Sequence, residues 1–278
     1  MFFRKKSVYV EQIEEQPIKE EFSTFGFNDI LHYIKRETGV DLFVKKSIIE
    51  TRMKLFCEER DINSLKKLHD EIQYKNDLRQ ELINLLTVNE TYFFREEKQL
   101  QEAIDFAKSR SGSVSILCAP CASGEEVYTL SIMMSEQFGS LKKFTITGID
   151  INSEAIKKAN QGVYSQRSLH KLSQTLKDKY FTLEGDMYSV KKHLFSSVRF
   201  SQVNIFENSF VNMGSFDIVF SRNMLIYFDD DFRVAAMKRF SQLLKPDGRL
   251  LLGHADIVPK NEWFTKHGFG SSCYYSKS

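Results

Sequence analysis

The spacing of apolar residues changes once along this chain, and that change limits the possible folds more than any other feature. In the first third of the chain apolar residues recur every three or four positions, as in Ile30, Leu31 and Ile34, which is the period of amphipathic helices. Further on, short apolar runs alternate with segments of helical period. We therefore predict an all-helical domain, residues 25–87, and an α/β domain, residues 88–278, whose mostly parallel sheet has helices on both faces.

Apolar runs and helical periods also place the elements of the α/β part. The predicted strands are Val114–Ala119, Phe144–Ile149, Val198–Val203, Phe216–Phe220 and Arg249–Gly253, and the predicted helices are Val127–Met134, Ser153–Asn160 and Asp231–Leu244. A charged stretch, residues 163–197, interrupts the alternation and is expected to be either a small inserted subdomain or a solvated excursion. Met1–Thr24 lack a helical apolar period and are expected to form a flexible tail.

Charge and hydropathy exclude several classes of function. The 39 Lys and Arg against 37 Asp and Glu leave a net charge of +2, which gives no electrostatic basis for nucleic-acid binding. No apolar run approaches the ~18 residues of a membrane span, and Arg4–Lys6 stand where a leader would be apolar, so we expect a cytoplasmic protein without membrane insertion. Cys118 and Cys121 lack a second ligand pair, so no metal is expected.

The segment Ser115–Tyr128 is predicted to be a strand, a loop of small residues and the start of a helix. Gly124 stands where the backbone can approach a ligand. No phosphate-binding glycine motif is present, and Glu125 and Glu126 stand where a polyphosphate would need neutral or positive groups. This acidic entrance favours a ligand with cationic and hydroxyl groups. The alternative is that both acids only stabilise the helix dipole.

Asp150 follows the next predicted strand, 26 residues after Gly124. A carboxylate at this place can accept hydrogen bonds from both ribose hydroxyls of a nucleoside. The alternative is that Asp150 caps the helix that follows it.

Six short motifs along the chain are each weak evidence, but their combination in this order is specific. They are Asn89–Arg95, Ala119–Glu126, Thr147–Ile151, Val203–Ile205, Phe216–Phe228 and Leu244–Gly248. In this order they closely resemble the CheR-type chemotaxis receptor glutamate methyltransferases, which use S-adenosylmethionine. The resemblance implies a Rossmann-like methyltransferase domain after the helical domain.

The resemblance also implies which residues form the site. Those expected to bind the cofactor are Asn89, Thr91, Arg95, Glu125, Asp150, Asn204, Ile205, Arg222 and Asn223. Among them, Glu125 would contact the methionine end and Asp150 the ribose, while Asn204 would lie at the adenine. Arg95 and Tyr227 are the expected catalytic residues beside the acceptor, although Tyr227 could instead be a core aromatic residue.

Two further features bear on the partner, which the resemblance implies is the cytoplasmic helical domain of a membrane chemoreceptor. The cations Lys45, Lys46, Arg52, Lys54 and Arg60 lie on or near one predicted helix and form either a receptor contact face or a generic solvated face. The chain has Gly253-His254-Ala255-Asp256 where the family usually has Gly-His-Ser-Glu. We expect His254 to be a hydrogen-bonded structural residue.

These expectations together predict transfer of a methyl group to receptor glutamates. A glutamate with a pKa of about 4.3 is already ionised at neutral pH, so the reaction needs no general base, and the chain shows no Ser-His-Asp pattern. One alternative is a catalytically silent signalling scaffold that binds S-adenosylmethionine. A second is a nicotinamide-dependent oxidoreductase, which Asp150 alone would suit but the missing dinucleotide glycines oppose.

Overall fold

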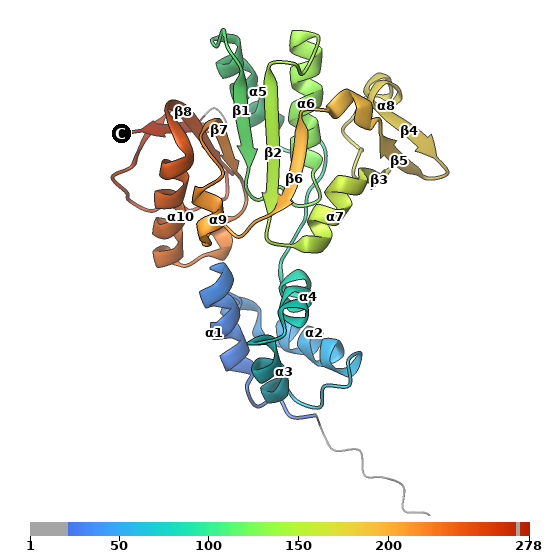
Figure 1. Cartoon of the computed structure of the whole chain (residues 1–278), viewed down its shortest axis with the longest axis vertical. Coiled ribbons are helices and arrows are strands. Elements are labelled where there is room, and N and C mark those ends of the chain that lie inside the picture. The colour runs from blue at the N-terminus through green and yellow to red at the C-terminus, as the bar shows by residue number, and fades with distance from the viewer. Residues whose placement is uncertain (1–21, 271–272) are drawn as a thin grey trace, which may run out of the picture.

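The computed structural model describes residues 22–270 and 273–278. The chain forms a helical part up to residue 86 and a larger part built on a sheet, with the two joined end to end (Figure 1). Within the described ranges no helix has the length and apolar character needed to cross a membrane.

The expected tail, Met1–Thr24, lies mostly outside the described residues. Its last residues correct the expectation, because Ser23 forms a β-bridge with Ser64 and Phe22 packs against the core of the helical part. Phe22 and Ser23 are therefore held by tertiary contacts.

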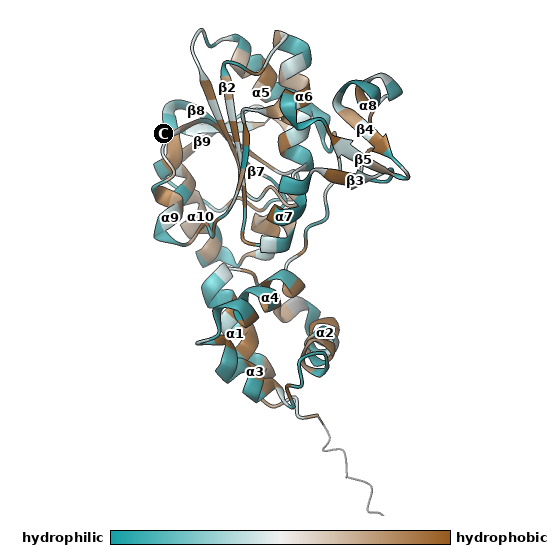
Figure 2. Ribbon diagram, turned by 45° about the vertical axis from the view of Figure 1, so that its right-hand side comes forward, coloured by the Kyte–Doolittle hydropathy of each residue, from teal (hydrophilic) through white to brown (hydrophobic). Residues whose placement is uncertain are grey.

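The helical part has the helices that the apolar period predicts. They are α1 (Phe27–Thr38), the short 3-10 helix η1 (Phe43–Lys45), α2 (Lys46–Glu58), α3 (Leu65–Ile72) and α4 (Asn76–Leu86). Figure 2 shows both hydrophobic and hydrophilic residues on these helices. Ile30, Met53 and Leu68 are fully buried where the helices meet. The side chain of Ser64 accepts a hydrogen bond from the Lys67 N–H and so caps α3.

The larger part has a seven-stranded sheet in the order β6-β2-β1-β7-β8-β10-β9. The strands are β1 (Val114–Cys118), β2 (Phe144–Asp150), β6 (Val198–Gln202), β7 (Phe216–Ser221), β8 (Leu244–Leu252), β9 (Phe264–His267) and β10 (Tyr274–Lys277). The first five of these pair in parallel, and β10 pairs antiparallel with both β8 and β9. The predicted mostly parallel sheet is confirmed.

Helices cover both faces of this sheet. They are α5 (Glu97–Lys108), α6 (Glu125–Phe138), α7 (Ser153–Gln161), α9 (Asn208–Val211) and α10 (Asp230–Leu243), with the 3-10 helix η3 (Leu225–Tyr227) after β7. Ile116 of β1 packs in the core that includes α5 and α6. Its neighbour Leu117 packs in a second core, which includes α10. Alternate residues of one strand thus face two apolar layers, as a doubly covered sheet requires.

Helix α5 and strand β8 differ from the sequence prediction, and the short helix α9 and the strands β9 and β10 were not predicted either. Helix α5 was not predicted, although its buried residues Leu100, Ala103, Ile104 and Ala107 recur at helical spacing. Strand β8 begins at Leu244, whereas the predicted start was Arg249. Phe216 of β7 pairs with Leu244, but Ile218, two residues further along β7, already pairs with Arg249. The intervening residues therefore bulge out of the ladder.

The inserted stretch folds as a small antiparallel sheet, which excludes the solvated excursion. Its strands are β3 (Val163–Ser165), β4 (Phe181–Glu184) and β5 (Met187–Val190), accompanied by α8 (Gln174–Tyr180) and the 3-10 helix η2 (Lys192–Phe195). Glu136 of α6 forms an ion pair with Lys179 at 2.6 Å and accepts a hydrogen bond from Tyr180. These contacts fasten the insert to one side of the main sheet (Figure 1).

Candidate active site

A cavity of about 560 Å³ lies between the helical part and the carboxyl ends of the parallel strands, within the usual size of small-ligand sites. The sheet side contributes Pro120–Ala122 after β1, Ile149–Ile151 at the end of β2, Val203–Ile205 after β6 and Arg222–Met224 after β7. Residues 86–92 and part of α2 complete the wall. This is the position at which open parallel sheets bind ligands.

Most of the predicted site residues line this cavity. They are Asn89, Thr91, Arg95, Asp150, Asn204, Ile205, Arg222, Asn223 and Tyr227. The chain therefore brings together residues from four separate segments, although the individual role of each residue stays a prediction.

Glu125 is the exception among the predicted site residues, and its role stays a prediction. Glu125 does not line the cavity. It is 3% exposed, and its carboxylate accepts a hydrogen bond from Ser123 Oγ at 2.8 Å; burial raises its pKa. The next residue, Glu126, lines the wall in its place. Adjacent residues on a helix point about 100° apart, so the sequence could not tell which of the two acids faces the ligand.

Glu126 belongs to a buried charge cluster with Arg222. The Arg222 side chain is 4% exposed, and its Nη1 lies 2.6 Å from Glu126 Oε2. Its Nη2 lies 3.1 Å from Glu96 and donates to the Arg95 carbonyl at 2.8 Å. His254 in turn contacts Glu96 at 2.9 Å, which confirms its hydrogen-bonded role. Removing one partner of such a cluster leaves an uncompensated buried charge.

Asp150 is held at the end of β2 by backbone groups. Its carboxylate accepts hydrogen bonds from the N–H groups of Ala122 and Asn152 at 2.8 and 2.9 Å. Asp150 is 4% exposed, and burial raises its pKa although these hydrogen bonds act in the opposite direction. Asn152 caps α7 by accepting from the Ala155 N–H. The alternative reading of Asp150 as the helix cap is therefore wrong.

Gly124 serves a different purpose from the one predicted. It precedes α6 in the left-handed region, with φ of 94°. A Cβ atom there would lie 2.9 Å from Ala159 Cβ and 3.0 Å from the ring of Phe200. Gly124 does not line the cavity. The packing of α6 against α7 and β6 therefore excludes a side chain at this position.

The mouth of the cavity combines apolar and cationic side chains. Ile48 is 61% exposed, Val88 49% and Ile226 36%, and Lys45 and Arg52 lie on the same wall. Tyr227 is half-buried there, and burial raises the pKa of its phenol. Its position on the cavity wall argues against a purely core role.

The five predicted cations do not form one face. Lys46 donates to Asn28, Lys54 lies over the ring of Phe22, and Arg60 pairs with Glu59 and Glu81. Only Lys45 and Arg52 lie at the cavity. The helical period of α2 distributes the other cations around the domain.

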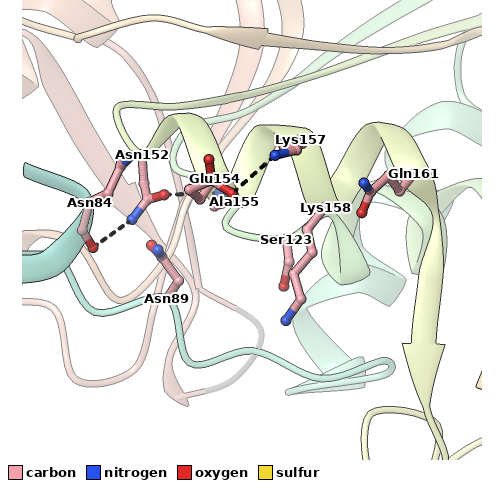
Figure 3. A pocket seen from close by; sticks show the side chains of 9 residues that line it. All are labelled: Asn84, Asn89, Ser123, Asn152, Glu154, Ala155, Lys157, Lys158 and Gln161. Atoms are coloured by element: carbon pink, nitrogen blue, oxygen red, sulfur yellow. Dashed lines mark hydrogen bonds and ion pairs between the residues drawn. The ribbon is translucent and has the colours of Figure 1, made fainter. Parts of the chain in front are cut away.

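A second hollow of about 500 Å³ adjoins the cavity at Asn89 (Figure 3). Two pairs of its lining residues interact with one another. Asn152 donates to the Asn84 carbonyl at 3.1 Å, and Lys157 pairs with Glu154 at 3.7 Å. The hollow is therefore a polar junction that ties α4 to α7 beneath the cavity.

The polar groups of the cavity fit the cofactor that the resemblance implies. The buried Oε1 of Glu126 has no hydrogen-bond partner among the described residues, and the Asp150 carboxylate borders the same space. The ammonium and the two ribose hydroxyls of S-adenosylmethionine provide donors for these acceptors. The same two carboxylates would repel the negatively charged pyrophosphate of a nicotinamide dinucleotide.

Comparison with known proteins decides the family. The model described as "CheR methyltransferase, all-alpha domain" matches residues 26–87, and the one described as "CheR methyltransferase, SAM binding domain" matches residues 89–272. The chain belongs to the CheR methyltransferase family. This CheR-family chain is a methyltransferase, and its cofactor is S-adenosylmethionine.

Two relatives of this CheR-family chain are described as chemotaxis protein methyltransferases. A "Chemotaxis protein methyltransferase" of Campylobacter jejuni is 38% identical over 256 residues, which cover 92% of this chain and 97% of that protein. "Chemotaxis protein methyltransferase 2" of Vibrio cholerae is 40% identical over 191 residues, covering 65% of this chain and 66% of that protein. Among solved structures, PKMT2 from Rickettsia typhi in complex with AdoHcy is 10% identical at a TM-score of 0.37, covering 60% of this chain and 26% of that one.

Proposed function

We propose that this CheR-family enzyme methylates glutamate side chains in the cytoplasmic helices of membrane chemoreceptors, as part of chemotaxis adaptation. The products are glutamate methyl esters and S-adenosylhomocysteine. The observation that carries this proposal is one cavity with two different ends, buried acids at the sheet and exposed apolar and cationic residues at the mouth. In this proposal residues 88–278 bind the cofactor and residues 25–87 contact the receptor helix. The reaction takes place in the cytoplasm.

The residues of the cavity have to align the reactants and exclude water. The bound cofactor supplies a methyl carbon that its positively charged sulfur has already activated. The acceptor carboxylate is ionised at neutral pH, so no side chain has to remove a proton. We assign Glu126 to the cofactor ammonium, Asp150 to the ribose hydroxyls and Asn204 to the adenine. Most of the rate enhancement then comes from orientation in a dry site.

Arg95 and Tyr227 are assigned to the acceptor carboxylate. Arg95 already donates from Nη1 to the Glu90 carbonyl at 2.8 Å, so part of its guanidinium is occupied. A moderate contact suits methyl transfer, because a tight ion pair would stabilise the reactant carboxylate more than the transition state.

The mouth fits a helix that is apolar on one face and acidic on its edges. Ile48, Val88 and Ile226 offer exposed apolar surface, while Lys45 and Arg52 offer positive charge beside it. A receptor helix that carries glutamates meets both requirements, and ester formation removes one of its negative charges. The charge change is the regulatory output of the reaction.

Labelled S-adenosylmethionine and a cytoplasmic chemoreceptor fragment test the proposal. We expect label in the fragment that is released as methanol by mild base, because carboxyl esters hydrolyse under conditions in which N-methyl groups do not. A fragment with its acceptor glutamates changed to glutamine is the control and should stay unlabelled. Binding of the cofactor without any transfer to receptor fragments would favour the signalling scaffold instead.

A further inference from the structure

The turn after β8 contains a carboxylate that bonds to the backbone of the cavity wall. Asp256 Oδ2 accepts hydrogen bonds from the N–H groups of Asn223 at 2.7 Å and Gly253 at 2.8 Å. Its Oδ1 accepts a longer hydrogen bond from the N–H of Ile226 at 3.3 Å. Asp256 does not line the cavity, so it can affect the ligands only through these neighbours.

The residues that Asp256 holds are parts of the cavity wall. Asn223 lines the cavity in the left-handed region, with φ of 59°, a conformation that a non-glycine residue keeps only when its surroundings enforce it. Ile226 also lines the cavity and is followed directly by Tyr227. One carboxylate thus fixes both the strained residue on the cofactor side and the turn that carries the predicted acceptor contact.

Gly253 shows how closely the turn after β8 approaches Asn223, in the segment after β7. A Cβ atom at Gly253 would lie 2.7 Å from the Asn223 nitrogen and 2.8 Å from Asp256 Oδ2. Neither atom is the end of a long flexible side chain, so this contact leaves little room for adjustment. The same turn also reaches the cavity wall through His254, which contacts Glu96 beside Arg222.

We propose that Asp256 is a positioning residue for methyl transfer, which fixes Asn223 toward the cofactor and Tyr227 toward the acceptor. This inference rests on the proposed function and adds a residue that contacts neither reactant. Charge-assisted hydrogen bonds to backbone N–H groups are strong and directional. Loss of the carboxylate therefore frees the Asn223–Tyr227 segment without removing any side chain from the cavity.

The test compares Asp256→Asn with Asp217→Asn. Asp217 is a matched control, because its carboxylate also accepts a backbone hydrogen bond, from Ser115, and pairs with Lys245 at the opposite end of β7. We expect Asp256→Asn to weaken S-adenosylhomocysteine binding by roughly tenfold or more in calorimetric titration and to lower kcat. Asp217→Asn should lower the melting temperature and leave both quantities unchanged. Asp256→Glu keeps a carboxylate at this position, so it should bind S-adenosylhomocysteine more tightly than Asp256→Asn does.

A second variant keeps the test decisive if Asp256→Asn does not fold. Gly253→Ala leaves the carboxylate in place but pushes on the Asn223 nitrogen, and it should weaken S-adenosylhomocysteine binding in the same way. Equal binding and kcat for Asp256→Asn and Asp217→Asn, measured on the folded fraction, would overturn the inference, as would unchanged binding in a folded Gly253→Ala variant. Binding needs no receptor, so failure to methylate any receptor fragment would refute the proposed function alone.

Discussion

The two ends of the cavity are built on different principles. At the sheet end, Arg222, Glu126 and Asp150 are largely buried and held by ion pairs or backbone hydrogen bonds. At the mouth, Ile48 is largely exposed and Arg52 lies beside it on α2. The first end is preorganised for one small ligand, whereas the second is an open surface suited to a macromolecule. Mutations should therefore act on stability and affinity at the sheet end and on substrate recognition at the mouth.

The largest effect is expected for Arg222→Met. It leaves Glu126 and Glu96 without their shared cation, so we expect a loss of about 3 to 5 kcal/mol in the free energy of unfolding. Urea denaturation followed by circular dichroism measures this loss. Lys108→Met is the control, because it breaks an exposed ion pair with Asp105 and should cost under about 1 kcal/mol. Equal losses would show that burial of the cluster does not matter.

Asp150→Asn should come next and should act on affinity. It removes the charge from the acceptor assigned to the ribose, and we expect S-adenosylhomocysteine to bind roughly ten to a hundred times more weakly. Calorimetric titration gives the dissociation constant. An analogue that lacks the ribose hydroxyls should show a much smaller difference between wild type and variant. An equal loss of affinity for both ligands would show that Asp150 does not bind the ribose hydroxyls.

The adjacent acids Glu126 and Glu125 give the sharpest comparison within the sheet end. Glu126→Gln should weaken S-adenosylhomocysteine binding by about tenfold, because the ligand ammonium loses a charged partner. Glu125→Gln should leave binding unchanged, since Glu125 does not line the cavity. Both dissociation constants come from the same titration, and the reverse order would restore the original expectation for Glu125.

Glu125 should instead influence how stability depends on pH. Burial raises its pKa in the folded protein above the ordinary value, so folding favours the protonated form. Its contribution to stability is complete below the unfolded-state pKa and is lost as the pH rises through the folded-state pKa. Glu125→Gln should remove this decline, so its melting temperature should fall less than that of the wild type between acidic and neutral pH. Parallel melting curves would contradict the prediction.

The smallest effect is expected at the mouth. Arg52→Glu should raise KM for a receptor fragment by a few-fold at low salt, because single exposed charge contacts contribute about 0.2 to 1 kcal/mol. The difference should shrink as salt screens the contact. Binding of S-adenosylhomocysteine should not change, and Lys54→Glu serves as a control on the same helix. Unchanged methylation across all salt concentrations would remove Arg52 from the receptor surface.

The sequence predicted the main elements well where a regular apolar pattern marks them. The parallel strands β1, β2, β6 and β7 lie close to their predicted positions. Short apolar runs mark β1 and β7, whereas β2 and β6 alternate apolar and polar residues. Helix α5 was missed although its buried residues Leu100, Ala103, Ile104 and Ala107 recur at helical spacing. Two of these four residues are alanines, so few large side chains mark its buried face.

The candidate site was predicted in outline and not in every side chain. Asp150 could be placed because a strand end has a defined position in a parallel sheet. The choice between Glu125 and Glu126 depends on the rotation of α6 about its axis, which the local sequence does not specify. The link from Glu96 to Arg222 joins residues far apart in the chain, and no local pattern could indicate it.

The junction between the two parts of the chain depends strongly on main-chain carbonyls. Asn204 donates to the carbonyl of Glu37, Gln80 to that of Ile151, and the Asp41 amide to that of Tyr227. Carbonyl acceptors are present whatever side chain occupies the position. Side-chain pairs also cross the junction, such as Lys35 with Asp229 at 2.7 Å. A relative's helical domain that keeps donors in the positions of Lys35 and Gln80 should therefore be exchangeable in a chimera, which would test whether receptor preference moves with that domain.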